Sequence, residues 1–373
     1  MHYTLHMTTR CNLRCDYCYV SHGMVEDMTL DTARAVVNLA AKSSKRAGLI
    51  FFGGEPLLKR ELIYETTAYA RAREKQTDCR FFLKITTNGL LLDDEFLDFI
   101  KRENMFVALS VDGTKEAHDA HRCDAAGQGS YDRVIEAARL LLAAKPYAPV
   151  LMTVRPDTLP HYAAGVETLF ALGFQYVICS LDYSADWREE DLPELARQYE
   201  TLAELYYQKT LAEDKFYFSP FEVKISSHVN NRTYCHERCE LGLRQLSVGP
   251  DGTLYPCVQF VGDRRFRLGD ARAGVDEAAR LALYEHNEKE KPGCDRCGIR
   301  TRCNHYCACL NKQATGSIDE ISPMLCAHER IVLPIADRLA GRLYREGNAL
   351  FIQKQYNEFY PVVSLAEDRG RSL

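Results

Sequence analysis

From residue 1 to about residue 220, the chain alternates short apolar runs with longer amphipathic stretches. The apolar runs predict strands at 3–7, 49–52, 81–86, 106–111, 149–154 and 175–179. Apolar residues at helical spacing predict helices at 30–46, 60–75, 93–102, 130–144 and 160–172. This alternation is typical of a parallel sheet with right-handed crossovers, and six units suit an open partial barrel. We therefore expect an α/β fold, a partial (β/α)6 TIM-like barrel, with ligands at the carboxyl ends of its strands.

The remainder of the chain follows a different pattern. A long helix is predicted at 188–213, and Pro220 with the polar run 226–233 indicates a linker out of the barrel. Two short β runs then flank the turn 249–252 and predict a hairpin, and a helix is predicted at 331–345. The expected parts are a barrel at 1–220, a cysteine-rich domain at 221–330, and a C-terminal helix and tail at 331–373 packed on the barrel.

Composition narrows the classes of function. The 373 residues carry a formal charge of −5 with a pI near 6.2, so no broad basic surface predicts nucleic-acid binding. The chain opens with no signal peptide and has no run of about 18 or more apolar residues, which argues against secretion and membrane spanning. Fifteen cysteines in such a chain indicate metal ligands in a reducing compartment, and we expect a cytoplasmic protein.

Three cysteines follow the first predicted strand at the spacing C-x3-C-x2-C. They are Cys11, Cys15 and Cys18. Thiolates this close together can hold one metal centre, and both iron–sulfur clusters and zinc prefer them. The next cysteine is Cys79, so the loop lacks the fourth thiol that would close a structural zinc site. A cluster held by three cysteines leaves one iron open to another ligand.

Zinc remains an alternative for this loop. Its fourth ligand would be one of the histidines His2, His6 and His22.

The second predicted strand ends in Gly53-Gly54-Glu55-Pro56. CxxxCxxC followed by GGEP after the second strand resembles the radical S-adenosylmethionine (SAM) enzymes. The resemblance implies a 4Fe–4S cluster whose open iron is chelated by the amino and carboxylate groups of SAM. One electron then cleaves SAM to a 5′-deoxyadenosyl radical, which abstracts a hydrogen atom from the substrate. The resemblance also implies a flavodoxin- or ferredoxin-type electron donor.

Polar residues after the third and fourth predicted strands complete the expected SAM site. The resemblance implies that Glu55 takes the ammonium of SAM and that the later groups lie near its methionine and ribose. A carboxylate suits an ammonium, and a guanidinium suits a carboxylate. Alternatively, Asn88-Gly89 and Asp112-Gly113 are only turns, as such dipeptides usually are. The expected SAM-binding residues are Tyr17, Gly53, Gly54, Glu55, Asn88, Ser110, Asp112 and Arg122.

A second group of cysteines follows the barrel. Cys239, twelve residues, Gly252, four residues and Cys257, followed by C-x2-C-x5-C-x3-C and a last cysteine, resemble the SPASM extension of radical SAM enzymes. The resemblance implies two auxiliary 4Fe–4S clusters, and therefore three clusters in all. The first would be held by Cys235, Cys239, Cys257 and Cys307. The second would be held by Cys294, Cys297, Cys303 and Cys326.

Some of the cysteine assignments stay open. Two zinc sites are the alternative, since CxxC pairs also form zinc ribbons. Cys235 has the least support, because C-x3-C is tighter than the common spacing, and an open iron in the first auxiliary cluster is the other possibility. The remaining thiols match no motif and are expected to be small buried hydrophobic side chains. They are Cys79, Cys123, Cys179 and Cys309.

One position bears on the reaction. Sulfatase maturases of this group carry an aspartate directly after the YPC cysteine, as candidate base in oxidising Cys or Ser to formylglycine. Here Val258 follows Tyr255-Pro256-Cys257, and valine cannot take a proton. The run YPC-x-QFVG, followed by the segment 266–269, resembles maturases that build cross-links, thioethers especially, in ribosomally made peptides. We expect such a peptide-modifying enzyme, and no general base can be identified.

Other functions stay open at this point. Within the enzyme class, they are formylglycine formation and the oxidation of a small molecule or another protein. Outside it, the cysteines would also suit an iron–sulfur electron carrier. Such a carrier has no need for Glu55 beside an open-site triad.

Peptide recognition is a separate question. Many peptide maturases of this group carry an appended leader-binding winged-helix domain. Here the first strand starts at residue 3 and the C-terminal tail is short. We therefore expect the peptide to be bound by the barrel mouth, by the extension, or by a separate leader-binding protein.

Overall fold

A nine-stranded curved sheet organises the computed structural model, which describes residues 1–20, 26–229 and 240–364. Its strand order is β7-β6-β5-β4-β3-β2-β1-β8-β9, and every neighbouring pair is parallel except β8 and β9. The strands are β1 (His2–His6), β2 (Arg46–Phe52), β3 (Arg80–Thr87), β4 (Phe106–Ser110), β5 (Pro149–Val154), β6 (Tyr176–Leu181), β7 (Tyr217–Phe218), β8 (Gln245–Val248) and β9 (Leu254–Tyr255). All six predicted strands are present, which confirms the expected α/β fold.

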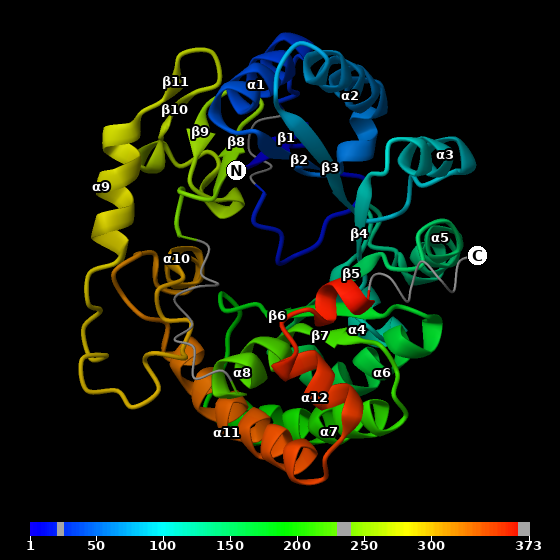
Figure 1. The fold of residues 1–373 in the computed structure, drawn as a ribbon, viewed down its shortest axis with the longest axis vertical. Coiled ribbons are helices and arrows are strands. Elements are labelled where there is room, and N and C mark those ends of the chain that lie inside the picture. The colour runs from blue at the N-terminus through cyan, green and yellow to red at the C-terminus, as the bar shows by residue number, and fades with distance from the viewer. Residues whose placement is uncertain (21–25, 230–239, 365–373) are drawn as a thin grey trace.

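Helices cover the outer face of this sheet (Figure 1). They are α1 (Leu30–Ser43), α2 (Arg60–Glu74), α3 (Asp94–Arg102), α4 (Lys115–His121), α5 (Tyr131–Ala144), α6 (Tyr162–Leu172) and α7 (Asp191–Leu211), with short 3-10 turns η1 (Pro56–Lys59) and η2 (Pro156–His161). In α1 the Thr29 side chain accepts a hydrogen bond from the Thr32 amide and caps the helix. Val36, Val37 and Ala40 then face the sheet and are fully buried.

The first strand, β1, is buried on both faces, whereas β3 alternates buried and more exposed residues. In β1 the four residues after His2 are all buried, as expected for a parallel sheet covered on both sides. Leu5, Phe51 and Ile85 are fully buried and belong to one continuous hydrophobic core. The loops at the carboxyl ends of the strands therefore stand on a rigid base.

The C-terminal part lies across the open side of the barrel (Figure 1). Its elements are α8 (Ser219–Val229), η4 (Val258–Phe260), η5 (Arg264–Phe266), β10 (Gly269–Asp270), β11 (Gly274–Val275), α9 (Glu277–Asn287), α10 (Ala308–Thr315), α11 (Pro323–Arg345) and α12 (Ala349–Tyr356). The predicted hairpin is present as β8 and β9, and β8 pairs with β1. The cysteine-rich segment thus continues the barrel sheet.

Two predicted boundaries were wrong in the described residues. Residues 219–229 form helix α8 and no linker there, because Pro220 sits in its first turn, where a missing amide costs nothing, and Phe221 is buried. Helix α11 begins at Pro323, before the predicted Ile331, because the Ser322 side chain caps it by accepting from the Leu325 amide. Residues 230–233 of the predicted linker lie outside the described residues.

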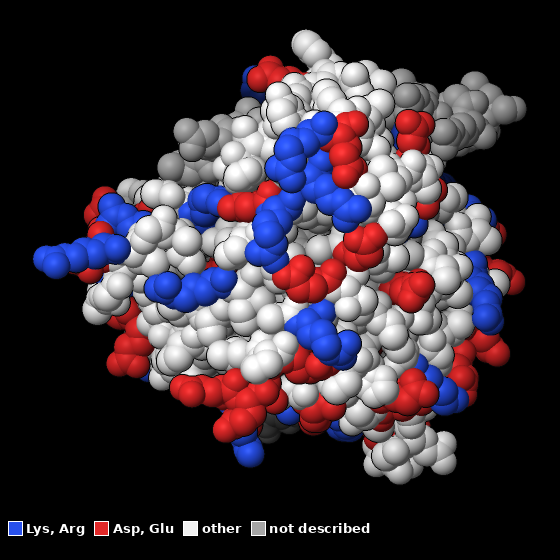
Figure 2. Space-filling view, turned by 90° about the horizontal axis from the view of Figure 1, so that it is seen from below, with Lys and Arg blue, Asp and Glu red and all other residues white. Residues whose placement is uncertain are grey.

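The surface agrees with the balanced charge of the sequence. In Figure 2, basic and acidic side chains are intermixed on the face seen from below. Within the described residues, no helix has both the length and the apolar character needed to cross a membrane.

Candidate functional site

A cavity of about 340 Å³ opens at the carboxyl ends of the barrel strands, within the size range of ligand pockets. It brings together all three cysteines of the first loop and six of the predicted SAM-binding residues. These are Cys11, Cys15, Cys18, Tyr17, Gly53, Gly54, Asn88, Ser110 and Arg122. Glu55 and Asp112, by contrast, do not line the cavity.

The end of β2 holds the cysteine loop in place. The amide of Gly54 donates to the Thr8 carbonyl and the amide of Glu55 to the Arg10 carbonyl, each at 2.8 Å. The approach is so close that a Cβ on Gly54 would stand 2.0 Å from the Arg10 carbonyl oxygen. Glycine is therefore required here, whatever the ligand. The amide of Arg14 donates to the Cys123 carbonyl at 2.7 Å and ties down the middle of the loop.

The three thiols of this loop suit an iron–sulfur cluster. Burial raises the pKa of Cys11 and Cys18, and that of Cys15 to about 12, so without metal they are neutral thiols that release protons on binding one. The Cys11 sulfur accepts from the Leu13 amide at 3.3 Å and from Nδ2 of Asn88 at 3.7 Å. Such donors to a ligating sulfur tune a cluster.

The structure describes two of the three histidines considered as a fourth zinc ligand. His2 lies at the amino end of β1, away from the loop, while His6 is buried against the edge of the Phe52 ring. His22 lies outside the described residues.

Glu55 is buried between the ends of β2 and β3. The side chain is fully buried, and its two oxygens accept from the Leu57 amide (3.0 Å), the Thr87 hydroxyl (2.8 Å) and the Asn88 amide (2.8 Å). The carboxylate thus joins the end of β2 to the end of β3. In this arrangement it positions the loops that face the cavity, which Gly53 and Gly54 line.

This position predicts a pH-dependent stability. Burial raises the pKa of Glu55 from 4.5 to about 7, although its hydrogen bonds oppose the shift. Between these values the folded protein holds a proton that the unfolded chain has lost, so stability falls as the pH rises from 4.5 to 7. Relative to Glu55→Gln, the metal-free protein should lose about 3 kcal/mol across this window. Urea unfolding at several pH values measures the difference, and parallel pH profiles for the two proteins would contradict it.

Asp112 and Arg122 form a buried ion pair behind the cavity wall. Nε and Nη2 of Arg122 lie 2.7 and 3.0 Å from the two oxygens of Asp112. Burial works to raise the pKa of Asp112, but the guanidinium outweighs it and keeps that pKa below its ordinary value. The Tyr17 hydroxyl and the Thr153 amide also donate to Asp112. Asp112 therefore orients Arg122 and Tyr17, which do line the cavity.

Asp182 is a site residue that the sequence analysis missed. It follows β6, is 5% exposed, and is the only carboxylate among the described residues that line the cavity. Its Oδ1 accepts from the Ser184 amide at 3.0 Å, and its Oδ2 lies 3.8 Å from the Arg155 guanidinium. No sequence motif marks Asp182. Its position shortly after a predicted barrel strand is the one feature of the sequence that could have indicated a site residue.

The cysteine-rich segment closes the same cavity. Gln259, Leu310 and Gln313 line it opposite the barrel residues. Nε2 of Gln313 lies 3.5 Å from Oδ1 of Asp182, which links the two walls. Val258 instead lines a neighbouring cavity, with His6 and Tyr255.

The described auxiliary cysteines fall into two groups. Cys257 and Cys307 lie together, and both hydrogen-bond Cys309, which lowers the pKa of each. Cys309 was expected to be a small buried hydrophobic side chain, and the structure places it beside these two thiols, against a buried apolar cluster. Cys309 stands two residues after Cys307, the last cysteine of the C-x3-C pattern, and no motif in the sequence marks it. Cys235 and Cys239 lie outside the described residues.

The other group contains the thiols assigned to the second cluster. Burial, together with the nearby thiols of Cys297 and Cys326, raises the pKa of Cys294, and burial raises that of Cys303 to about 12. Arg302 holds this loop, because its guanidinium forms a bidentate pair with Asp337 of α11 at 2.8 and 2.6 Å. The loop thus rests on the helix that packs against the barrel.

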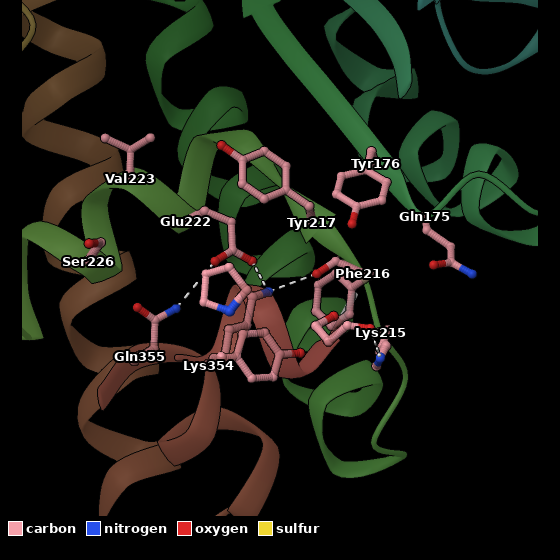
Figure 3. A pocket seen from close by; sticks show the side chains of 13 residues that line it. Gln175, Tyr176, Lys215, Phe216, Tyr217, Glu222, Val223, Ser226, Lys354 and Gln355 are labelled. Atoms are coloured by element: carbon pink, nitrogen blue, oxygen red, sulfur yellow. Dashed lines mark hydrogen bonds and ion pairs between the residues drawn. The ribbon is translucent and has the colours of Figure 1, made fainter. Parts of the chain in front are cut away.

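A larger cavity of about 560 Å³ lies beside β7, which pairs with the first residues of β6 (Figure 3). Glu222 of α8 and Lys354 of α12 form an ion pair inside it, and Nε2 of Gln355 lies 3.3 Å from Glu222. Lys354 also donates to the Phe216 carbonyl at 2.8 Å. Glu222 and Lys354 thus neutralise each other's charge inside the cavity. None of the predicted site residues that the structure describes lines this cavity.

Comparison with known proteins agrees with the geometry. The model of the radical SAM superfamily matches residues 5–197, more than half of the chain. A cysteine-type anaerobic sulfatase-maturating enzyme of Clostridium perfringens (strain 13 / Type A) is 24% identical over 304 residues, which cover 75% of this chain and 79% of the relative.

Solved structures share the fold. Native anSMEcpe with bound AdoMet and Kp18Cys peptide has a TM-score of 0.79 at 19% identity and covers 93% of this chain and 100% of its own. Streptococcus suis SuiB bound to the precursor peptide SuiA has a TM-score of 0.63 at 14% identity, covering 87% and 75%. The superfamily match, together with the cysteine loop and GGEP segment at one cavity, identifies the chain as a member of the radical SAM superfamily and as an enzyme.

Proposed function

We propose that this enzyme modifies a ribosomally made peptide by an oxidative cross-link, with a thioether favoured. Val258 carries the proposal. The sulfatase maturases described above place an aspartate directly after the YPC cysteine, whereas this chain has a valine there that lines a different cavity. The side chain at the next position, Gln259, lines the main cavity and cannot act as a base.

The residues of the main cavity would bind both the cluster and SAM. Cys11, Cys15 and Cys18 would hold a 4Fe–4S cluster, and the backbone of Gly53 and Gly54 would face the amino acid part of SAM. The remaining contacts would come from Tyr17, Asn88, Ser110 and Arg122. When bound, SAM and the cluster supply the hydrogen-atom abstraction, and an auxiliary cluster supplies an acceptor for the second electron.

Asp182 would handle the proton that leaves the substrate. Its Oδ2 lies 3.8 Å from the Arg155 guanidinium, its ion-pair partner within the described part of the chain. The two walls of the cavity meet at this residue through Gln313. A substrate side chain held between the barrel and the cysteine-rich segment would therefore have a carboxylate beside it.

The auxiliary centres and the domain limits belong to the same proposal. Residues 221–330 would form the SPASM domain with two further 4Fe–4S clusters, and residues 331–373 would pack on the barrel. Of these, α11 packs against α7 and α8. A flavodoxin- or ferredoxin-type protein would supply electrons, and the barrel mouth, the cysteine-rich segment or a separate leader-binding protein would bind the peptide.

Formylglycine formation is the second candidate. It is favoured by the curated relative named above, a sulfatase-maturating enzyme that resembles this chain over 75% of its length. This function needs another group in place of the missing aspartate, and Asp182 would be that group.

One assay separates the two functions. Reconstituted enzyme should form no aldehyde on a Cys-type sulfatase peptide, because Val258 replaces the aspartate that follows the YPC cysteine in sulfatase maturases. The one carboxylate described in the cavity, Asp182, follows β6 on the barrel wall instead. Hydrazine-trapped aldehyde is measured by mass spectrometry, and a sulfatase-maturating enzyme is the positive control. Aldehyde formed over many turnovers would contradict the cross-linking proposal and support the second function.

A further inference from the structure

Cys309 lies inside the first group of auxiliary cysteines, although no motif assigns it. Its Sγ atom is 3.4 Å from Sγ of Cys307, and it also hydrogen-bonds the thiol of Cys257. The local sequence explains the contact. Cys307 is the residue before α10 and Cys309 is in its first turn, so both leave the same end of the helix. Three thiols from two separate segments therefore meet at one point.

The surroundings of these thiols favour a metal. Tyr255, Phe260 and Ile318 pack with Cys257 in a small buried cluster, apart from the main core, and Cys309 packs against it. Backbone amides of Val258 and Gln259 donate to the Cys257 sulfur, and those of Cys309 and Leu310 donate to the Cys307 sulfur, as amides commonly do to ligating thiolates. Thiol protons that sit between sulfurs are what a soft metal replaces when it binds.

We propose that Cys309 is a ligand of the iron–sulfur centre formed with Cys257 and Cys307. The inference rests on the proposed first auxiliary cluster and adds a thiol that the SPASM pattern does not contain. It also makes Cys235 dispensable, because a cluster with four irons needs no more than four protein thiols. A merely structural Cys309 would donate a hydrogen bond to its neighbours and leave the iron in place.

Four variants of the full chain test the ligand role after anaerobic reconstitution. Cys309→Ala should lose about one to four iron atoms per chain, as Cys257→Ala does, because the cluster loses an iron or fails to form. Cys309→Ser should retain part of this iron, since its oxygen is a poorer ligand. Cys79→Ala is the matched control, a buried free cysteine beside β3, and should keep all its iron. Circular dichroism of the metal-free proteins checks that each is folded.

The outcomes distinguish the ligand role of Cys309 from the existence of the first auxiliary cluster. If Cys257→Ala loses iron and Cys309→Ala retains as much as Cys79→Ala, Cys309 is no ligand. If Cys257→Ala also keeps its iron, the auxiliary cluster itself is refuted. Alkylation of the wild-type protein gives a readout that needs no variant. Iodoacetamide should label Cys309 only after a chelator has removed iron, and labelling that iron removal leaves unchanged would overturn the inference.

Discussion

Replacing Cys11, Cys15 and Cys18 together by alanine should abolish reductive cleavage of SAM. The three thiols lie in one loop at one cavity, and no other cysteine of the described residues lines it. If all three proposed clusters form, the wild-type protein carries about twelve irons per chain, and the variant should lose about a third of them. Iron analysis and chromatographic measurement of 5′-deoxyadenosine with dithionite as reductant check both effects.

A matched control accompanies this experiment. Cys123→Ala removes the thiol of a free cysteine near the same loop. The contact of Cys123 with the loop is made by its backbone carbonyl, which accepts from the Arg14 amide and is kept in the variant. This control should retain iron and SAM cleavage. If the triple variant still cleaves SAM, the three cysteines do not hold the reacting cluster.

Arg122→Ala should lower the free energy of unfolding by about 3–5 kcal/mol, because it leaves the buried carboxylate of Asp112 without its partner. Asp112 is 2% exposed, and the donors left to it, the Tyr17 hydroxyl and the Thr153 amide, carry no charge. Urea unfolding of the metal-free protein measures the loss. The same substitution should weaken SAM binding, since Arg122 lines the cavity.

Arg133→Ala is the control for the ion pair. Arg133 pairs with Asp124 at 3.7 Å on the surface, and such exposed pairs contribute about 0–1 kcal/mol. A loss for Arg122→Ala no larger than that for Arg133→Ala would mean that the buried pair does not hold this wall of the cavity.

The sequence predicted the parts of the site that depend on local spacing. Cys11, Cys15 and Cys18 share one loop, and Gly53-Gly54 must be glycines where β2 meets that loop, so short segments suffice to recognise them. Parallel strands place their carboxyl ends at one edge, which is why Asn88 and Ser110 could be expected beside the cysteines.

Other residues depend on contacts between distant segments. Glu55 was expected to bind the ammonium of SAM, and the structure adds two partners that no sequence pattern shows, the Thr87 hydroxyl and the Asn88 amide, which donate to its oxygens. Asp112 is likewise occupied by Arg122. The sequence did not predict the role of Cys309, because Cys309 contacts Cys257, which lies about fifty residues earlier in the chain. The α8 boundary failed for a different reason, since a proline in a first turn and a proline in a linker look alike.

The central claim is that this chain uses a cluster with an open iron to cleave SAM. The most direct measurement is anaerobic reconstitution of the wild-type protein, followed by addition of SAM and dithionite and quantification of the products. The account predicts 5′-deoxyadenosine and methionine in equal amounts, and none from the triple cysteine variant. A protein that holds its full iron and binds SAM but releases no 5′-deoxyadenosine would contradict it, and would point to an iron–sulfur electron carrier instead.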